Sequence, residues 1–246
     1  MSTDSLSRRF LAAVSYLTIF PLSKREEDTV DFLAYFPLVG FLLGCFLLLC
    51  AHLFEEAFYP AINALFIVSI LTVVTRGRHL DSLAAILDGL TRGKDVRGKR
   101  TIMLEHQRGS FGVMCLVLAI LAKYLLISHL VEAGSFHSLL FFPTVGRWAM
   151  ICLAWFFPVT PEDGFVGYPT SRDFLWATGI TLLCSILTHG LVGLGIVVLA
   201  WILIYGIGHY FVKRINKGIT VQVMEASVEL VEILALSLLV ALLGGF

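Results

Sequence analysis

The sequence predicts an all-α fold: a polytopic integral membrane bundle of about seven spanning helices, preceded by a helix in the membrane interface. Composition is the first observation, because 58% of the 246 residues are hydrophobic and only 15% are charged, whereas soluble domains carry about 25% charged residues. The mean hydropathy is +0.88. Apolar runs of roughly 16 to 22 residues recur along the chain, which is the length that a membrane-spanning helix needs. The apolar–polar alternation of a membrane barrel is absent.

The first expected element is the interfacial helix, over residues 6–20. This run is amphipathic and too short to cross a bilayer, and it carries Arg8 and Arg9 near its start. Both properties are typical of a helix that lies along the membrane surface. Pro21 ends the run, and a charged turn follows over 24–28.

The longer apolar tracts predict the spanning helices. The tract over 174–212 is too long for one span, and Thr188-His189-Gly190 predicts a tight turn that divides it into two. Gly40 and Gly44 lie four residues apart, a spacing that permits close contact between helices. The expected spans are 37–54, 62–75, 113–130 and 139–157, two within 174–212, and 226–243. No internal repeat is visible, so the chain is predicted to be one membrane-embedded domain, 1–246.

The distribution of charge predicts the orientation. Lys and Arg gather in the N-terminal segment, in 76–108 and in 213–217, whereas the alternate loops 54–61, 131–138 and 188–191 contain none. By the positive-inside rule, the N-terminus and the polar loops face the cytoplasm from the inner membrane, and the C-terminus lies outside. The formal net charge of zero gives a nucleic-acid partner no support. No Cys/His pair has the spacing of zinc ligands, and the five cysteines are interpreted as packing residues.

The longest polar interval, 76–112, is predicted to be a cytoplasmic loop that carries the chemistry. It holds eight of the eighteen Lys and Arg residues and four acids. Asp81 and Asp88 are seven apart on an expected short helix over 81–90, so they share a face about 10 Å apart along the axis. Carboxylates at the edge of a membrane bundle suit Mg²⁺-dependent phosphoryl chemistry. His79 stands beside them and is a candidate for proton transfer.

Two other interpretations of this interval stay open. The interval is also compatible with a solvated, charge-balanced loop that has no catalytic role. Its basic residues suit a polyphosphate, and they equally suit lipid headgroups that fix the orientation of the chain.

Ionisable residues inside the apolar tracts form a second set of candidates. Glu225, Glu229 and Glu232 follow the spacing i, i+4, i+7, so they form one acidic stripe that runs into the last span. Arg147 lies within the fourth span. Charges at that depth are costly and usually face the interior of a bundle. We therefore expect Arg147 to pair with one of these acids or with a substrate phosphate.

These residues resemble a known family. HLDSLAAILDGL, over 79–90, resembles the HLDGLADxxDG signature of cobalamin synthases, the adenosylcobinamide-GDP ribazoletransferases. Further resemblances follow in the same order as in that family: YLTIFP at 16–21, YFPLVG at 35–40, IMLEHQRGSFGV at 102–113, GRW at 146–148, and GITVQVMEASVELVE at 218–232. Together they cover most of the chain.

The resemblance implies a membrane-bound, Mg²⁺-dependent phosphotransferase of late cobalamin biosynthesis. Such an enzyme joins adenosylcobinamide-GDP to α-ribazole or its 5′-phosphate and releases GMP. Its partners are these substrates and the lipid membrane, with other corrinoid-assembly enzymes as candidates. The implied catalytic residues are His79, Asp81, Asp88 and Glu105, of which Asp81, Asp88 and Glu105 are the metal ligands. The implied substrate-binding residues are Arg147, Thr220, Glu229 and Glu232.

The chain also departs from the family pattern. Ala85 and Gln222 stand where the pattern has aspartate, and Leu104 and His106 also differ from it. Three glycines of the pattern become Ser82, Val221 and Glu225. These departures favour an alternative, a non-catalytic relative that acts as a corrinoid-binding membrane scaffold. A transporter ranks last, because paired broken helices in two matching halves are not visible.

Overall fold

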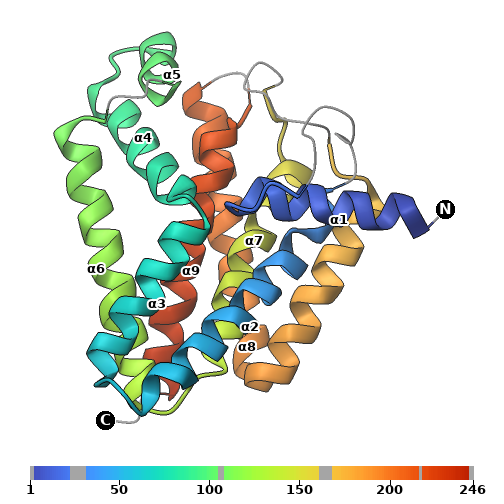
Figure 1. Cartoon of the computed structure of the whole chain (residues 1–246). Coiled ribbons are helices and arrows are strands. Elements are labelled where there is room, and N and C mark those ends of the chain that lie inside the picture. Colours follow the sequence, from blue (N-terminus) through green and yellow to red (C-terminus); the bar gives the residue numbers. More distant parts are fainter. Residues whose placement is uncertain (1–2, 23–31, 105–107, 161–167, 216–217, 244–246) are drawn as a thin grey trace.

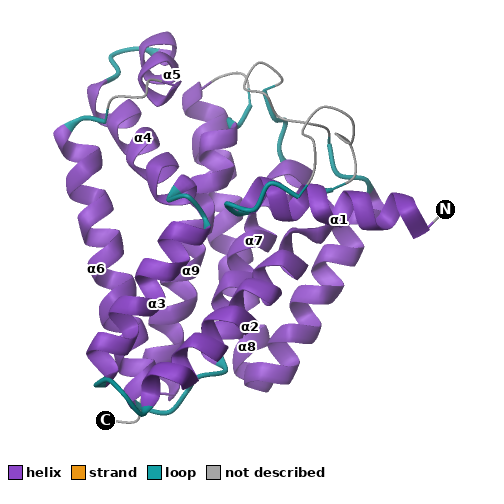
Figure 2. Ribbon diagram, in the orientation of Figure 1, coloured by secondary structure: helices purple, strands orange, loops and turns teal. Residues whose placement is uncertain are grey.

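All regular secondary structure that the computed structural model describes is helical, apart from one isolated bridge between Val159 and Ile219. The described residues are 3–22, 32–104, 108–160, 168–215 and 218–243. Figure 2 shows the result, a bundle of helices joined by short loops. The predicted all-α class is therefore confirmed.

Each apolar tract that was predicted to span the membrane coincides with a helix. By length and composition, four of the described helices are apolar enough to cross a membrane, or five if a bent pair is counted as one span. The helices are α1 (Thr3–Leu17), α2 (Phe36–Glu55), α3 (Pro60–Val74), α4 (Arg78–Arg92), α5 (Val96–Leu104), α6 (Ser110–Glu132), α7 (Ser138–Phe156), α8 (Ser171–Ile215) and α9 (Val221–Leu243), with a 3-10 turn, η1, at Leu33–Tyr35. Large apolar side chains such as Leu53, Leu125 and Leu187 are exposed on these helices. Several long apolar helices with apolar outer faces indicate an integral membrane protein.

Helix α7 forms the centre of the bundle, because other helices pack around it. The spacing of Gly40 and Gly44 predicted close helix contact, and the structure confirms it. A Cβ atom at Gly44 would lie 2.6 Å from the carbonyl oxygen of Leu139, and one at Gly40 would collide with the carbonyl of Pro143. Because α2 lies this close to the backbone of α7, the side chains of α7 are shielded from the surroundings. Arg147, in the middle of α7, is only 1% exposed.

The long helix α8 breaks where the sequence predicted a turn. Gly190 has φ 58° and ψ −131°, a conformation that only glycine adopts readily. Just after the break, a Cβ atom at Gly193 would lie 2.6 Å from the carbonyl oxygen of Ser185. The two halves of α8 therefore approach each other closely at the turn.

The polar interval 76–112 is mostly helical rather than an open loop. Helix α4 is bent by 81° from α3, and the bend is made by Arg76 and Gly77, which both have positive φ. The side chain of Arg76 donates a hydrogen bond of 3.0 Å to the carbonyl oxygen of Ile19, which holds this uncommon backbone conformation against the segment after α1. Helix α4 is amphipathic, so its apolar face packs on the bundle although the interval as a whole is polar.

The polar interval lies at one end of the molecule (Figure 1). In Figure 1, α1 lies across the bundle, and the α4–α5 pair projects from the same end as the starts of α8 and α9, whereas the C-terminus lies at the opposite end. The crosswise position of α1 agrees with the predicted interfacial helix, although α1 ends at Leu17 rather than at residue 20.

Candidate functional site

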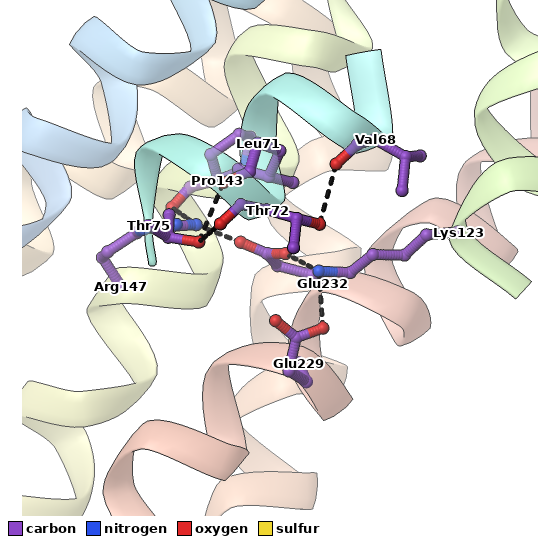
Figure 3. A network of polar contacts seen from close by, with 9 residues as sticks. All are labelled: Val68, Leu71, Thr72, Thr75, Lys123, Pro143, Arg147, Glu229 and Glu232. Atoms are coloured by element: carbon purple, nitrogen blue, oxygen red, sulfur yellow. Dashed lines mark hydrogen bonds and ion pairs between the residues drawn. The ribbon is translucent and has the colours of Figure 1, made fainter. Parts of the chain in front are cut away.

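Four charged side chains meet inside the bundle, from three helices (Figure 3). Arg147 of α7 donates through Nη1 to Glu232 Oε1, and Lys123 of α6 donates through Nζ to Glu232 Oε2. Lys123 Nζ also lies 2.6 Å from Glu229 Oε2, and Glu229 and Glu232 are both on α9. All four side chains are at most 5% exposed. Two positive and two negative charges balance, which is the condition for keeping them inside a bundle. We call Lys123, Arg147, Glu229 and Glu232 the buried charge network.

The sequence explains why these charges can meet. Glu229 and Glu232 share one face of α9, and α7 offers that face a glycine, because a Cβ atom at Gly146 would lie 2.7 Å from Glu232 Cγ. Of the two partners predicted for Arg147, an acid of this stripe or a substrate phosphate, the structure shows the acid, Glu232. Lys123 was not predicted. It carried the same signal as Arg147, a cation in the middle of an apolar run, and that signal could have identified it.

Two buried polar groups, one close to this network and one within it, have nitrogen atoms without a hydrogen-bond partner in the described part of the chain. His79, at the start of α4, is 2% exposed, and within the described part of the chain neither of its ring nitrogens has a hydrogen-bond partner. The same holds for Nε of Arg147. The charges of Arg147, Lys123 and Arg78 all act on the His79 ring. Buried polar groups are normally paired, so the unpaired imidazole of His79 and the unpaired Nε of Arg147 are each suited to take a polar ligand.

Glu225, the third acid of the α9 stripe, joins three elements rather than entering the network. Its carboxylate accepts a hydrogen bond of 2.6 Å from Ser82 Oγ on α4 and one of 3.1 Å from the Tyr16 hydroxyl on α1. Arg78 Nη1 lies 3.5 Å from the same carboxylate, and its guanidinium lies 4.5 Å from the centre of the Tyr16 ring. Ser82 and Glu225 both stand where the family pattern has glycine. The two departures therefore contact each other, and Ser82 supplies the buried carboxylate with a donor that glycine lacks.

Asp81 lies on the exposed face of the first turn of α4 and pairs with Arg108. The guanidinium donates through Nε to Oδ1 at 2.7 Å and through Nη2 to Oδ2 at 2.6 Å, the two-point geometry that arginine favours with carboxylates. The Asp81 side chain is 57% exposed. This hydrogen-bonded carboxylate raises the pKa of the Arg108 guanidinium, which is protonated at any physiological pH in any case.

Asp88 is two turns further along α4 and is buried, with 1% exposure. Its carboxylate accepts hydrogen bonds from the backbone N–H groups of Gly109, at 2.5 Å, and Gly112, at 2.9 Å. These groups belong to the N-terminal end of α6, where unpaired N–H groups favour a negative charge. The structure therefore brings Asp81 and Asp88 onto one short segment, 108–112, at two separate points.

The remaining predicted residues are less informative. Thr220 is buried directly before α9, and its hydroxyl accepts a hydrogen bond of 3.3 Å from the N–H of Val223, which is the contact of a helix N-cap. Glu105 lies outside the described residues. Among the residues that the structure does describe, no group of three or more His, Cys, Asp or Glu side chains is arranged to hold a metal ion.

Comparison with known proteins identifies the relatives of this chain. A protein family described as cobalamin-5-phosphate synthase matches residues 9–240. A protein of Geotalea daltonii named adenosylcobinamide-GDP ribazoletransferase is 34% identical over 251 aligned residues, which cover 97% of this chain and 99% of the relative. A protein of the same name from Syntrophobacter fumaroxidans is 31% identical over 239 residues, covering 93% and 96% of the two chains. No solved structure matches this chain.

Proposed function

We propose that this chain, which belongs to the cobalamin-5-phosphate synthase family, is a membrane-bound adenosylcobinamide-GDP ribazoletransferase of cobalamin biosynthesis. The observation that carries the proposal is similarity over nearly the whole chain to proteins of that name, at about 30% identity. The site supports it, because the polar interval carries cationic side chains and the bundle holds buried polar groups, His79 and Nε of Arg147, that have no hydrogen-bond partner within the described part of the chain.

In this reaction a ribose hydroxyl of α-ribazole, or of its 5′-phosphate, attacks the phosphorus on the corrinoid side of the diphosphate. The new P–O bond forms as the bond from that phosphorus to the bridging oxygen breaks, and the bridging oxygen leaves with GMP. The hydroxyl proton passes to a base. The main task of a protein in such a transfer is to position both groups and to stabilise charge on the leaving phosphate.

The unpaired groups around the buried charge network support two of these roles. Arg147 is held by Glu232 through Nη1, which leaves Nε as a free donor for a phosphate oxygen. His79 has two unpaired ring nitrogens and is the histidine nearest the signature carboxylates in sequence, so we assign it the transfer of the hydroxyl proton. Glu229 and Glu232 act indirectly, because they fix Arg147 and Lys123. Thr220 fixes the start of α9.

Magnesium is proposed as the cofactor on chemical grounds. Of the two predicted ligands that the structure describes, Asp81 has an exposed carboxylate, whereas both oxygens of Asp88 accept backbone hydrogen bonds. Glu105, outside the described residues, is the second expected ligand. Mg²⁺ commonly shares its sites between one or two carboxylates and the phosphates of a substrate, and the diphosphate brings such oxygens. Bound Mg²⁺ would supply positive charge to the leaving phosphate.

The membrane placement is also part of the proposal. Seven spans follow if α3, α9 and both halves of α8 each cross the bilayer, together with α2, α6 and α7. The polar end would then face the cytoplasm from the inner membrane, with α1 along its surface. The common position of α1, α4 and α5 at one end of the bundle supports this orientation (Figure 1).

The test is GMP release by the purified protein in lipid nanodiscs, supplied with adenosylcobinamide-GDP and α-ribazole, with and without Mg²⁺. Asp81→Asn should lower the rate on the order of a hundredfold or more, because a ligand of the proposed Mg²⁺, and with it positive charge at the leaving phosphate, is lost. Asp173→Asn is the matched control, since Asp173 caps the start of α8 through Thr170. Full turnover by Asp81→Asn would remove Asp81 from the mechanism.

One observation favours the alternative, a corrinoid-binding scaffold without catalysis. Ala85 is fully buried between Asp81 and Asp88 on α4, at a position where the family pattern has a carboxylate. The scaffold hypothesis expects no GMP release from the natural chain and activity only in Ala85→Asp. Turnover by the natural chain would exclude it.

A further inference from the structure

Both aspartates of α4 contact the segment 108–112, but at different residues and in different ways. Asp88 is buried and binds backbone, whereas Asp81 is largely exposed and binds the Arg108 side chain. The contact of Asp88 is therefore fixed inside the protein, whereas solvent or a ligand can reach the contact of Asp81.

The contact of Asp88 fixes the backbone next to Arg108. Its carboxylate holds the N–H groups of Gly109 and Gly112, and neither glycine leaves room for a side chain. A Cβ atom at Gly109 would lie 2.7 Å from Asp88 Oδ1, and one at Gly112 would lie 2.6 Å from the carbonyl oxygen of Ala84. Because Gly109 follows Arg108 directly, this buried contact determines where the Arg108 side chain starts.

The contact of Arg108 with Asp81 is of the kind that a phosphate can replace. Arg108 offers two parallel N–H groups, and this geometry matches carboxylate and phosphate equally. The Asp81 side chain is 57% exposed and that of Arg108 is 17% exposed, so water reaches this ion pair from the side of the carboxylate. A second cation, Arg92, lies next to the backbone that follows Arg108, because its Nη1 is 2.8 Å from the position of a Cβ atom on Gly109.

We propose that Arg108 is a further substrate-binding residue: its guanidinium releases Asp81 and binds a phosphate of the nucleoside diphosphate instead. Asp88 is the positioning residue, because it holds the backbone from which the Arg108 side chain extends. The proposal rests on the proposed function, since it assigns a residue to the nucleotide end of that substrate. The exchange is a change of hydrogen-bond partner, and no covalent bond is made or broken. It also uncovers the Asp81 carboxylate at the moment when the diphosphate arrives.

The test is the affinity of the purified protein for GDP, measured by calorimetry in nanodiscs of phosphatidylcholine. Arg108→Gln should weaken GDP binding about tenfold or more, because a charge-assisted pair of hydrogen bonds is lost. Arg108→Lys should weaken it less, since a single ammonium keeps the charge and loses the two-point geometry. Guanosine, which has no phosphate, should bind both variants as it binds the natural chain. Arg214→Gln is the control, because Arg214 packs on the Tyr210 ring of α8.

A double-mutant cycle tests the role of Asp88. Asp88→Asn should weaken GDP binding in the natural background and have no further effect on it in Arg108→Gln, because there is then no side chain left to present. If Asp88→Asn weakens GDP binding equally in the natural chain and in Arg108→Gln, then Asp88 has a general structural role and does not act through Arg108. This arm depends on Asp88→Asn folding, whereas the Arg108 variants decide the main claim without it.

Three results would overturn the main claim. GDP affinity unchanged in Arg108→Gln would make Arg108 an ordinary surface partner of Asp81. An effect that appears only when phosphatidylglycerol is added would assign Arg108 to lipid headgroups. An equal loss of guanosine binding would show that the phosphate is not what Arg108 recognises. GDP binding through Arg108 without any GMP release from adenosylcobinamide-GDP would instead contradict the proposed transferase and leave the phosphate site standing.

Discussion

Charged residues do different work on the buried and the exposed face of the first turn of α4. At its start, His79 adjoins the buried charge network, whose four side chains are at most 5% exposed and balance one another. On its polar side, Asp81 and Arg108 form a pair that water reaches. Both regions pair acids with cations, but their surroundings differ.

The difference teaches which charges are free to change partners. Inside the bundle the attraction between opposite charges is only weakly screened, and an isolated charge is very costly, so each member needs its partners at all times. On the exposed face, water and salt screen the pair, and a phosphate can compete with the Asp81 carboxylate for Arg108. We therefore regard the buried charge network as a fixed scaffold and the exposed pair as the part that exchanges.

The largest expected effect comes from breaking the balance of the network. Lys123→Met leaves Glu229 and Glu232 with Arg147 as their only cation in the network, so one buried negative charge has no counter-charge. Removing one partner of a buried pair typically costs about 3–5 kcal/mol. The measurement is equilibrium unfolding of the purified protein in detergent.

The control for this variant restores neutrality without restoring the ion pair. Lys123→Met combined with Glu229→Gln removes one charge of each sign and should recover most of the lost stability. If the double variant is no more stable than the single one, charge balance is not what holds this part of the bundle together.

The sequence predicted the helices of the bundle well, because each depends on a long local apolar run. The break at Gly190 was also predictable, since Thr188-His189-Gly190 interrupts such a run. The 81° bend between α3 and α4 was not. It depends on the uncommon backbone conformation of Arg76, which is held by the distant carbonyl of Ile19. No local sequence pattern predicts a contact between two segments that lie so far apart in the chain.

Only those contacts of the site that follow from the charges of the side chains could be predicted from the sequence. An intramembrane cation needs an acid, so the pairing of Arg147 with the α9 stripe followed from the sequence. The interaction of Asp88 with the N-terminal end of α6 was not predicted, because nearly every residue has a backbone N–H group and only an indirect signal in the sequence marks those that bind a side chain. In retrospect the two glycines of RGSFG were that signal, since a close approach is one of the few reasons for glycine at the start of a helix. The role of Glu105 stays a prediction, because it lies outside the described residues.

A smaller effect is expected where α4 meets α6. In Gly112→Ala, the new methyl group would collide with the Asp88 carboxylate and lie 2.6 Å from the carbonyl oxygen of Ala84. Helix α6 must then move away from α4, and overpacking of this kind costs about 1–3 kcal/mol. Unfolding in detergent measures the loss. Gly179→Ala on α8 is the matched control, because no atom lies within 4 Å of the new methyl group, and the change should be neutral or stabilise by about 0.5–1 kcal/mol. Equal behaviour of the two variants would mean that the α4–α6 contact adapts freely.

The smallest effect on stability belongs to the exposed pair. Asp81→Asn removes one partner of an ion pair whose carboxylate is 57% exposed, and such pairs contribute about 0–1 kcal/mol. We expect its unfolding curve to lie close to that of the natural protein and to respond little to added salt, although its transfer activity is lost. Arg108→Gln should show the same small change in stability. A loss above about 2 kcal/mol in either variant exceeds what an exchangeable surface pair contributes. Asp81 and Arg108 would then belong with the fixed contacts of the fold, and a phosphate could not displace one from the other at low cost.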